Sequence, residues 1–485
     1  MRDEKKFPSP ILSSDEDTHA ILKGNKAMKM IRIKRLMNQR GSAFRKAVVT
    51  ALLLPIVWFS LPIATGVTAS LLGFVPLLGR PTVSSITINI VAGEQSIVCR
   101  ATYWEAEKKE KDNALRSEEI NINADSTAEI TLKSLKADTR YNYRIQARHY
   151  DSKESTVVAE ASFKTQRLQP GSFSFALLAD AHLTPSRTER LETLARTSSS
   201  ILNRRPEFLL MLGDNIQTFT SHGGPMTDAS YGPYLYRLLR QGLGNLPRSI
   251  PVFTVNGNWE GENGWHPLKE RGWARAARKA YFPNPGSDTF PQGGSQNEDY
   301  YGFIWGDALF LVLNVTGYTP TDHALGSLAG KPDDWTLGEK QKAWLQAQLA
   351  GSKARWKLLF IHHTPGGNAG DDVNSRYGRG GGRAAKTGEQ ALIHSWMRQY
   401  GVQALFYGHD HVFTDIAVDG IHYVCVGSAG APWKFGTQET GYEKFWTPSG
   451  FTWVDVSPEA LRVSFVEASE SVAEGRTLHS FVIKP

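Results

Sequence analysis

The stretch that decides the fold is FSFALLADAH, residues 173–182. Its first six residues are almost all apolar, which is typical of a strand buried on both faces of a sheet. Two polar residues, Asp180 and His182, follow directly where that strand ends. In an open α/β sheet, ligands bind at the carboxyl ends of the strands. We therefore expect Asp180 and His182 to face a binding site.

The same arrangement, an apolar strand followed by polar residues, recurs further along the chain. Helical stretches lie between some of these units, at about residues 187–202, 335–349 and 389–399, so the chain has the βα rhythm of an α/β domain. The strands are expected at residues 208–212, 252–255, 358–361 and 404–407, and the clusters that follow them are Gly213-Asp214-Asn215, Asn256-Gly257-Asn258-Trp259-Glu260, His362-His363 and Gly408-His409-Asp410-His411.

These clusters together supply carboxylates, one amide oxygen and several imidazoles at one edge of a sheet. A single Asp-x-His or Gly-Asp pair is a weak signal, but five clusters at the ends of five strands are a strong one. Mixed carboxylate, amide and imidazole ligands suit Fe, Mn or Zn better than Mg alone. The sequence therefore predicts a metal centre at this edge.

The order of the motifs resembles the calcineurin-like metallophosphoesterase superfamily, whose pattern is DxH, GD, GNH(D/E), a His motif and GHxH. The resemblance implies two metal ions, each Fe, Mn or Zn, and a metal-bound hydroxide that attacks a phosphate ester. Two cations can polarise the phosphoryl oxygens and stabilise the leaving oxygen. By this resemblance one metal would be held by Asp180, His182, Asp214 and His411, and the second by Asp214, Asn258, His362 and His409, with Asp214 as the bridging carboxylate.

Two positions depart from the pattern. In the purple acid phosphatase branch a ligating Tyr stands three residues after the bridging Asp, but this chain has Gln217 there. No tyrosinate colour is therefore expected. The second departure is Trp259, where the family motif carries a His. An indole can donate a hydrogen bond but cannot titrate near neutral pH.

The loss of that His raises the question of which group protonates the leaving oxygen. The candidates are His363, adjacent to a predicted ligand, and His266, on the same loop as Trp259. The position of His363 favours a group that faces the pocket; the alternative is a packed imidazole of the sheet. Asp410, which stands between two predicted ligands, is expected to orient them rather than to coordinate.

Before these motifs, residues 81–168 show short segments of alternating polar and apolar residues, which predict a small all-β sandwich. The stretch Leu135–Arg144 resembles the turn and late strand of fibronectin-type-III-like domains. Together with the motifs this arrangement resembles the purple acid phosphatase type of metallophosphoesterase, with a β domain at 81–168 and a phosphoesterase domain at 170–485. A spacer or packing module is the default interpretation of the β domain.

The charge of the chain is concentrated at its N-terminus. Residues 1–46 hold twelve basic and five acidic residues, which accounts for the whole net charge of +7. The rest of the chain is neutral, so no nucleic-acid binding is expected.

Residues 47–79 are uncharged and mostly apolar, and a membrane helix needs about 20 such residues. The sequence predicts a basic cytoplasmic tail and a transmembrane anchor; a cleaved signal peptide and a soluble core helix are the alternatives.

The fold class predicted from the sequence is α/β (α+β): a metallophosphoesterase β-sandwich flanked by helices, preceded by a small all-β sandwich and an N-terminal transmembrane helix. The predicted function is a membrane-anchored, exported phosphoesterase that acts on phosphate esters, with monoesters favoured over diesters. The expected location is a single-pass position in the cell membrane, with the N-terminus cytoplasmic and the catalytic domain periplasmic or extracellular. The alternative is a catalytically degenerate surface binding or adhesion protein on the same fold.

Overall fold

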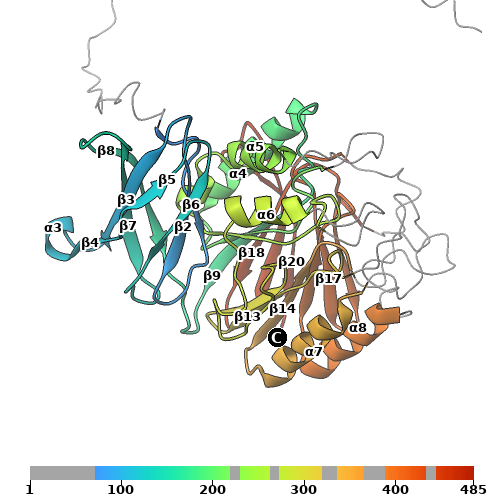
Figure 1. Cartoon of the computed structure of the whole chain (residues 1–485). Helices are drawn as coiled ribbons and strands as arrows, with labels where there is room; N and C mark the ends of the chain where they lie inside the picture. The colour runs from blue at the N-terminus through green and yellow to red at the C-terminus, as the bar shows by residue number, and fades with distance from the viewer. Residues whose placement is uncertain (1–70, 219–229, 263–271, 319–335, 365–387, 433–443) are drawn as a thin grey trace, which may run out of the picture. The chain divides into compact units, whose positions relative to one another are not determined.

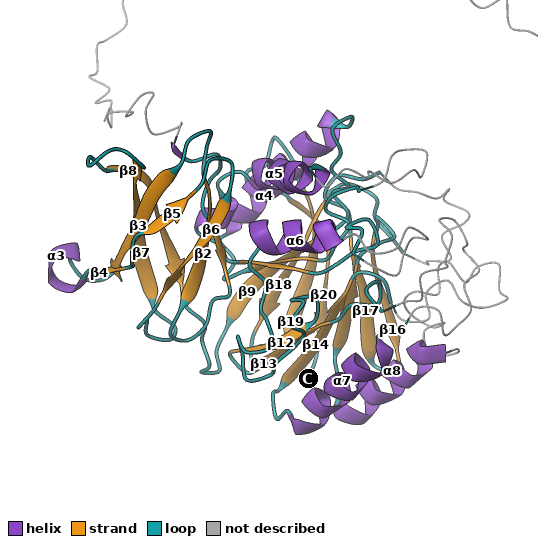
Figure 2. Cartoon of the chain, in the orientation of Figure 1, coloured by secondary structure: helices purple, strands orange, loops and turns teal. Residues whose placement is uncertain are grey.

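The computed structural model describes residues 71–218, 230–262, 272–318, 336–364, 388–432 and 444–485. Within these ranges the chain forms a small β domain followed by a larger α/β domain, both coloured in chain order in Figure 1 and by secondary structure in Figure 2. The predicted cytoplasmic tail and most of the predicted anchor lie outside the described residues.

The β domain consists of two antiparallel sheets that share one apolar core. Side chains of both sheets, such as Ile88 and Tyr143, are fully buried in that core. This part of the chain therefore forms a β-sandwich; its assignment as a separate domain and the resemblance to fibronectin type III stay predictions. One sheet has the order β1 (Leu77–Gly79), β2 (Ile86–Val91) and β6 (Thr127–Leu132); the other has β4 (Leu115–Arg116), β3 (Ile97–Glu105), β7 (Arg140–His149) and β8 (Thr156–Lys164), with β5 (Ile120–Ile122) also on β3 and the short helix α3 at Glu110–Asn113.

The predicted anchor extended too far along the chain, because residues 71–79 belong to the β domain. Strand β1, Leu77–Gly79, pairs with β2, and Leu71, Leu77 and Leu78 are buried in the protein. The apolar character of this stretch therefore serves a protein core rather than a lipid environment. Among the described helices, none combines the length and the apolar composition that crossing a bilayer requires. Residues 47–70, the remainder of the predicted anchor, lie outside the described part of the chain.

The α/β domain contains two six-stranded sheets that pack face to face. The first has the order β11 (Val252–Thr254), β10 (Leu209–Met211), β9 (Phe173–Leu178), β18 (Gly450–Val456), β19 (Leu461–Glu467) and β20 (Arg476–Ile483). The second has the order β12 (Tyr301–Trp305), β13 (Ala308–Val312), β14 (Trp356–Ile361), β15 (Ala404–Tyr407), β17 (Ile421–Val426) and β16 (Phe413–Val418). An aromatic-rich core fills the space between them.

Helices cover the outer face of each sheet, as Figure 1 shows. Outside the first sheet lie α4 (Thr188–Arg204), α5 (Tyr231–Leu243), the 3₁₀ turn η1 (Leu246–Arg248) and α6 (Gly272–Tyr281). Outside the second lie α7 (Gly338–Gly351) and α8 (Gly388–Tyr400). The predicted β-sandwich flanked by helices is confirmed.

Side-chain alternation along β9 shows why this strand is apolar throughout. Phe175 and Leu177 point into the core between the sheets, whereas Ala176 and Leu178 pack against the helices. Successive side chains of a strand point to opposite faces, so a strand covered on both sides needs apolar residues at every position.

The site is positioned by the parallel strands. Strands β9, β10 and β11 run parallel in the first sheet, and β13, β14, β15 and β17 run parallel in the second. Their carboxyl ends therefore meet at one edge of the sandwich, which is the edge at which ligands bind in such sheets.

Candidate metal centre

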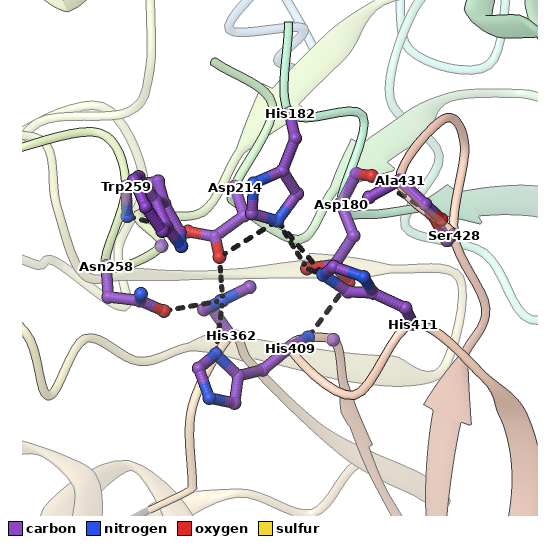
Figure 3. A network of polar contacts seen from close by, with 12 residues as sticks. Asp180, His182, Asp214, Asn258, Trp259, His362, His409, His411, Ser428 and Ala431 are labelled. Carbon is purple, nitrogen blue, oxygen red and sulfur yellow. Dashed lines mark hydrogen bonds and ion pairs between the residues drawn. The ribbon is translucent and has the colours of Figure 1, made fainter. Parts of the chain in front are cut away.

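All seven predicted metal ligands come together at that edge, and every one of them is buried. Figure 3 shows their side chains converging. They belong to the loops that follow β9, β10, β11, β14 and β15. The carboxylate and imidazole ligands form two groups, each with its donor atoms within 4.8 Å of one another: Asp180, His182 and His411, and Asp214, His362 and His409.

The first group gathers around one carboxylate oxygen. Oδ1 of Asp180 lies 3.3 Å from Nε2 of His411 and 3.6 Å from Nε2 of His182. The two imidazole nitrogens lie 3.0 Å from each other. The other oxygen of Asp180 accepts a hydrogen bond from the backbone N–H of His409 at 2.8 Å. That bond ties Asp180 to the loop that carries both His409 and His411.

The second group is built around His362. Its Nε2 lies 3.0 Å from Oδ2 of Asp214, 3.2 Å from Nδ1 of His409 and 3.1 Å from Oδ1 of Asn258. The Asn258 amide places a polar atom here in either orientation, since the rotated amide would donate to Nδ1 of His409 at 2.8 Å. A cation would select the orientation with the carbonyl oxygen inward, because only that atom offers a lone pair.

Two of the four imidazoles are oriented by backbone carbonyls behind them. Nδ1 of His362 donates to the carbonyl oxygen of Leu212 at 2.7 Å, and Nδ1 of His411 donates to that of Pro432 at 2.8 Å. A carbonyl oxygen can only accept, so Nδ1 carries a proton in both rings, and Nε2 offers its lone pair to the site once a cation displaces any second proton. This arrangement, a carbonyl behind each ligating ring, is common around metal ions in proteins.

The donor set fits a pair of cations. Oδ1 of Asp180 is buried and accepts no hydrogen bond, although two imidazole nitrogens face it. Buried acceptors that converge without donors between them need a positive charge to compensate their desolvation. Carboxylate, imidazole and amide ligands suit Fe, Mn or Zn.

The backbone at the site is held in a conformation that most residues avoid. Five of the seven ligands have positive φ, between 46° and 74°: Asp180, His182, Asp214, His409 and His411. Non-glycine residues in this left-handed region carry strain that the surrounding structure has to offset, and such residues cluster at functional sites.

Known proteins with this arrangement are found by sequence and by fold. Residues 173–413 match the calcineurin-like phosphoesterase family, a range that includes all seven ligands. This part of the chain is a calcineurin-like phosphoesterase domain. It is also similar to human tartrate-resistant acid phosphatase type 5, with 26% identity over 179 residues, which is 33% of this chain and 49% of that relative. The match thus spans about half the length of the curated relative.

Two solved structures share the fold across most of the chain. Purple acid phosphatase from yellow lupin seeds has a TM-score of 0.62 and 16% identity, over 84% of this chain and 74% of that one. PhoD has a TM-score of 0.65 and 15% identity, over 87% of this chain and 92% of the PhoD chain. The family match and the acid phosphatase relative support a hydrolase that acts on phosphoric esters.

Electrostatic interactions at the site favour the charged form of the carboxylates of Asp180 and Asp214. Burial raises the pKa of Asp180, but the charge of His411 and the short polar contacts with His182 and His411 outweigh burial, so the pKa is lowered. Burial likewise opposes ionisation of Asp214, and His362 more than compensates, so its pKa is also lowered. For His362, burial alone would lower the pKa, but the charge of Asp214 raises it to about 9.

The residues at the two departures from the family pattern take positions that the sequence did not show. Oε1 of Gln217 accepts a hydrogen bond from Nη1 of Arg190 at 3.2 Å, and the same Nη1 donates to the carbonyl oxygen of His182 at 2.9 Å. Gln217 thus helps to hold the loop of His182. Trp259 is half-buried, with its ring centroid 5.7 Å from that of His182. The indole therefore stands beside His182, one of the predicted metal ligands.

The candidate proton donors differ in how far they can be placed. His363 is fully buried; its Nδ1 donates to the carbonyl oxygen of Thr364 at 3.0 Å, and its ring centroid lies 4.5 Å from that of His409. His266 lies outside the described residues. Asp410 is fully buried between the two ligands that flank it in sequence. The roles assigned to these three residues stay predictions.

Sequence reasoning assigned no role to Glu260, the last residue of the Asn256–Glu260 cluster. Its side chain is 2% exposed and contacts the backbone of the loop that carries Asp214. Burial and the neighbouring charge of Asp214 raise the pKa of its carboxyl to about 7. The available signal was the acidic position at the end of the family's third motif, GNH(D/E), which Glu260 occupies in this chain.

Proposed function

We propose that this chain hydrolyses phosphate esters at a dinuclear metal centre. The observation that carries the proposal is the position of Asp214, whose Oδ2 lies within 3.4 Å of His182 in one ligand group and 3.0 Å of His362 in the other. A single carboxylate between two groups of ligands is what a pair of cations requires if they are to act on one substrate.

The chain's own residues would divide the work between them. Asp180, His182, Asp214 and His411 would hold one cation, and Asp214, Asn258, His362 and His409 the other. Bound cations would supply Lewis-acid polarisation of the phosphoryl group and a water of lowered pKa. The carbonyls of Leu212 and Pro432 keep their two imidazoles aimed inward before any ligand arrives. The proposed metals are Fe, Mn or Zn, because the ligands mix imidazole with oxygen.

Within this activity we expect monoesters to be preferred over diesters. The support is the acid phosphatase relative. The test compares a nitrophenyl phosphate monoester with the corresponding bis-nitrophenyl diester, using full-length protein that has been reconstituted with each metal. A larger kcat/KM for the monoester supports the preference, and a larger value for the diester overturns it.

We further propose that the protein is anchored in the cell membrane and that its phosphoesterase domain is exported. The support is the charge distribution: the basic residues lie before an uncharged run, as the positive-inside bias requires. Residues 47–70 still exceed the roughly 20 residues of a span, even though residues 71–79 fold into the β domain.

The topology can be tested with a reporter enzyme that is active only outside the cytoplasm, fused after Pro485. An active reporter and a protein that stays in the membrane fraction at high pH fit the proposal. An inactive reporter contradicts export. Release into the medium or periplasm would indicate a cleaved signal peptide instead.

A further inference from the structure

The carboxylate of Glu260 joins two loops that carry metal ligands. It belongs to the loop after β11, but its oxygens face the backbone of the loop after β10. Oε2 accepts from the N–H of Asp214 at 2.9 Å, and Oε1 accepts from the N–H of Asn215 at 2.8 Å. Oε2 also accepts from the N–H of Gly257 at 2.8 Å, within its own loop. One buried carboxylate therefore satisfies three buried backbone donors.

The connection between the loops is reciprocal. The N–H of Trp259, next to Glu260, donates to Oδ1 of Asp214 at 2.8 Å. Asp214 is thus held at its backbone by Glu260 and at its side chain by Trp259, which leaves Oδ2 directed at the two histidines. Its φ of 52° is a left-handed conformation, which needs such fixed partners.

The spacing between the loops leaves no room for larger residues. A Cβ atom on Gly257 would lie 2.3 Å from both N and Oδ1 of Asp214, and 2.7 Å from Oε2 of Glu260. These distances are far below normal contact, so Gly257 has to be a glycine for the loops to approach each other. The close approach and the carboxylate hydrogen bonds are parts of one arrangement.

We propose that Glu260 is a positioning residue that sets the affinity of the centre for metal, by fixing Asp214 and Asn258 relative to each other. The proposal rests on the dinuclear centre proposed above. Asn258 lies two residues before Glu260 on the same loop, and Asp214 receives its hydrogen bonds from that loop. Without Glu260, the bridging carboxylate and the amide ligand would each have to be ordered by the metal itself, which would weaken binding.

A carboxylate is required because it accepts at both ends. Three N–H groups converge on two oxygens, and an ionised carboxylate can accept at each of them. In Glu260→Gln, one of those oxygens becomes an NH₂ group that faces an N–H donor. At least one buried backbone donor then loses its partner, although the size and shape of the side chain hardly change.

The test measures metal affinity directly. Full-length protein and its Glu260→Gln variant are stripped of metal with a chelator and titrated with Mn²⁺, with the free ion followed by its paramagnetic resonance signal. We expect the variant to bind at least one of the two ions about 10–100-fold more weakly, the usual effect of changing a group that orients metal ligands. At saturating Mn²⁺, kcat for a nitrophenyl ester should recover towards the wild-type value.

Glu207→Gln is the matched control. Glu207 precedes β10, at the opposite end of that strand from Asp214, and its carboxylate accepts from Nε1 of Trp305 and from Nζ of Lys164. This variant also loses part of the hydrogen bonding of an inward-facing carboxylate, and should lower the melting temperature without changing the affinity for Mn²⁺. Equal affinity losses in the two variants would mean that the effect of Glu260 is general destabilisation, and would overturn the proposal.

Mn²⁺ binding by the wild-type protein distinguishes a failure of the dinuclear centre from a failure of the role of Glu260. Wild-type protein that binds no Mn²⁺ would contradict the dinuclear centre itself, whatever the variants do. Wild-type protein that binds two ions, with a folded Glu260→Gln that binds them equally well, would overturn only the role of Glu260. If Glu260→Gln does not fold, Gly257→Ala, which pushes the same loops apart, takes its place in the titration with the same criteria.

Discussion

The Oδ2 atom of Asp214 lies 3.0 Å from Nε2 of His362. The same oxygen lies 3.4 Å from Nε2 of His182, which belongs to the other group of ligands. Both imidazoles and the carboxylate are buried, so their interaction is not weakened by solvent. This carboxylate is therefore the structural link between the two proposed metal positions.

Asp214→Ala should remove that link. We expect the variant to lose at least one metal ion and several orders of magnitude in kcat, because deleting a bridging ligand removes the activated water together with the electrophile. Metal analysis and steady-state kinetics measure both effects. Asp410→Ala serves as the comparison. Asp410 is buried between His409 and His411 and is predicted only to orient them, so this variant should lose less activity. A near-normal metal content in Asp214→Ala would refute the assignment.

The convergence of the seven predicted ligands could be foreseen from the sequence because each stands within a short motif at the end of an apolar strand. Local pattern was sufficient there: the polar residues follow the strand directly, and parallel strands bring their ends together. Asp180 and His411 are far apart in the chain, yet each was identified by its own strand, and their donor atoms lie 3.3 Å apart.

Features that depend on contacts between distant segments were missed. The apolar stretch Leu77–Gly79 has the same composition whether it faces lipid or a protein core, and only its pairing with β2 distinguishes the two. The proposed role of Glu260 depends on the proximity of two loops that are distant in the sequence, since Asp214 and Glu260 are 46 residues apart. Gln217 departs from the family's tyrosine, but its bond with Arg190 follows from the position of α4.

Trp259→His should change the choice of leaving group. The indole stands beside His182 and cannot donate a proton at neutral pH, whereas an imidazole at that place can. General-acid assistance is worth about 10²–10⁴-fold and matters most when the departing alkoxide is basic. We therefore expect Trp259→His to accelerate alkyl phosphates much more than nitrophenyl phosphate, as measured by kcat for the two classes. Equal effects on both classes would show that the residue at 259 takes no part in proton transfer.

His363→Gln tests the remaining candidate donor within the described residues. If His363 protonates the leaving oxygen, the variant should slow alkyl esters far more than nitrophenyl esters, with metal content unchanged. Its complete burial against His409 allows the alternative that it is a packing residue. Equal slowing of the two ester classes, or none, would rule it out as the acid and leave His266 or a metal-activated water.

Behind the site, Arg278 and Glu262 form a buried ion pair whose stability can be tested. Nε of Arg278 donates to Oε1 of Glu262 at 2.6 Å, and the side chains are 1% and 2% exposed. Arg278→Met leaves the carboxylate of Glu262 buried without its main partner, which should lower the free energy of unfolding by about 3–5 kcal/mol.

Denaturant titration measures that loss. The double variant Glu262→Leu/Arg278→Met should recover much of it, because it buries no uncompensated charge. A single Arg278→Met variant as stable as wild type would mean that Arg275, whose Nε lies 3.7 Å from Oε2 of Glu262, can replace Arg278.

The dinuclear centre can be tested by the metal stoichiometry of full-length protein, determined in the same sample as its rate of nitrophenyl phosphate hydrolysis. We expect activity to rise as metal is added and to reach its maximum at two ions per chain, since Asp214 joins two ligand groups. A folded protein that binds no metal and hydrolyses neither the monoester nor the diester would contradict the dinuclear centre, and would favour a binding or adhesion role for the same fold.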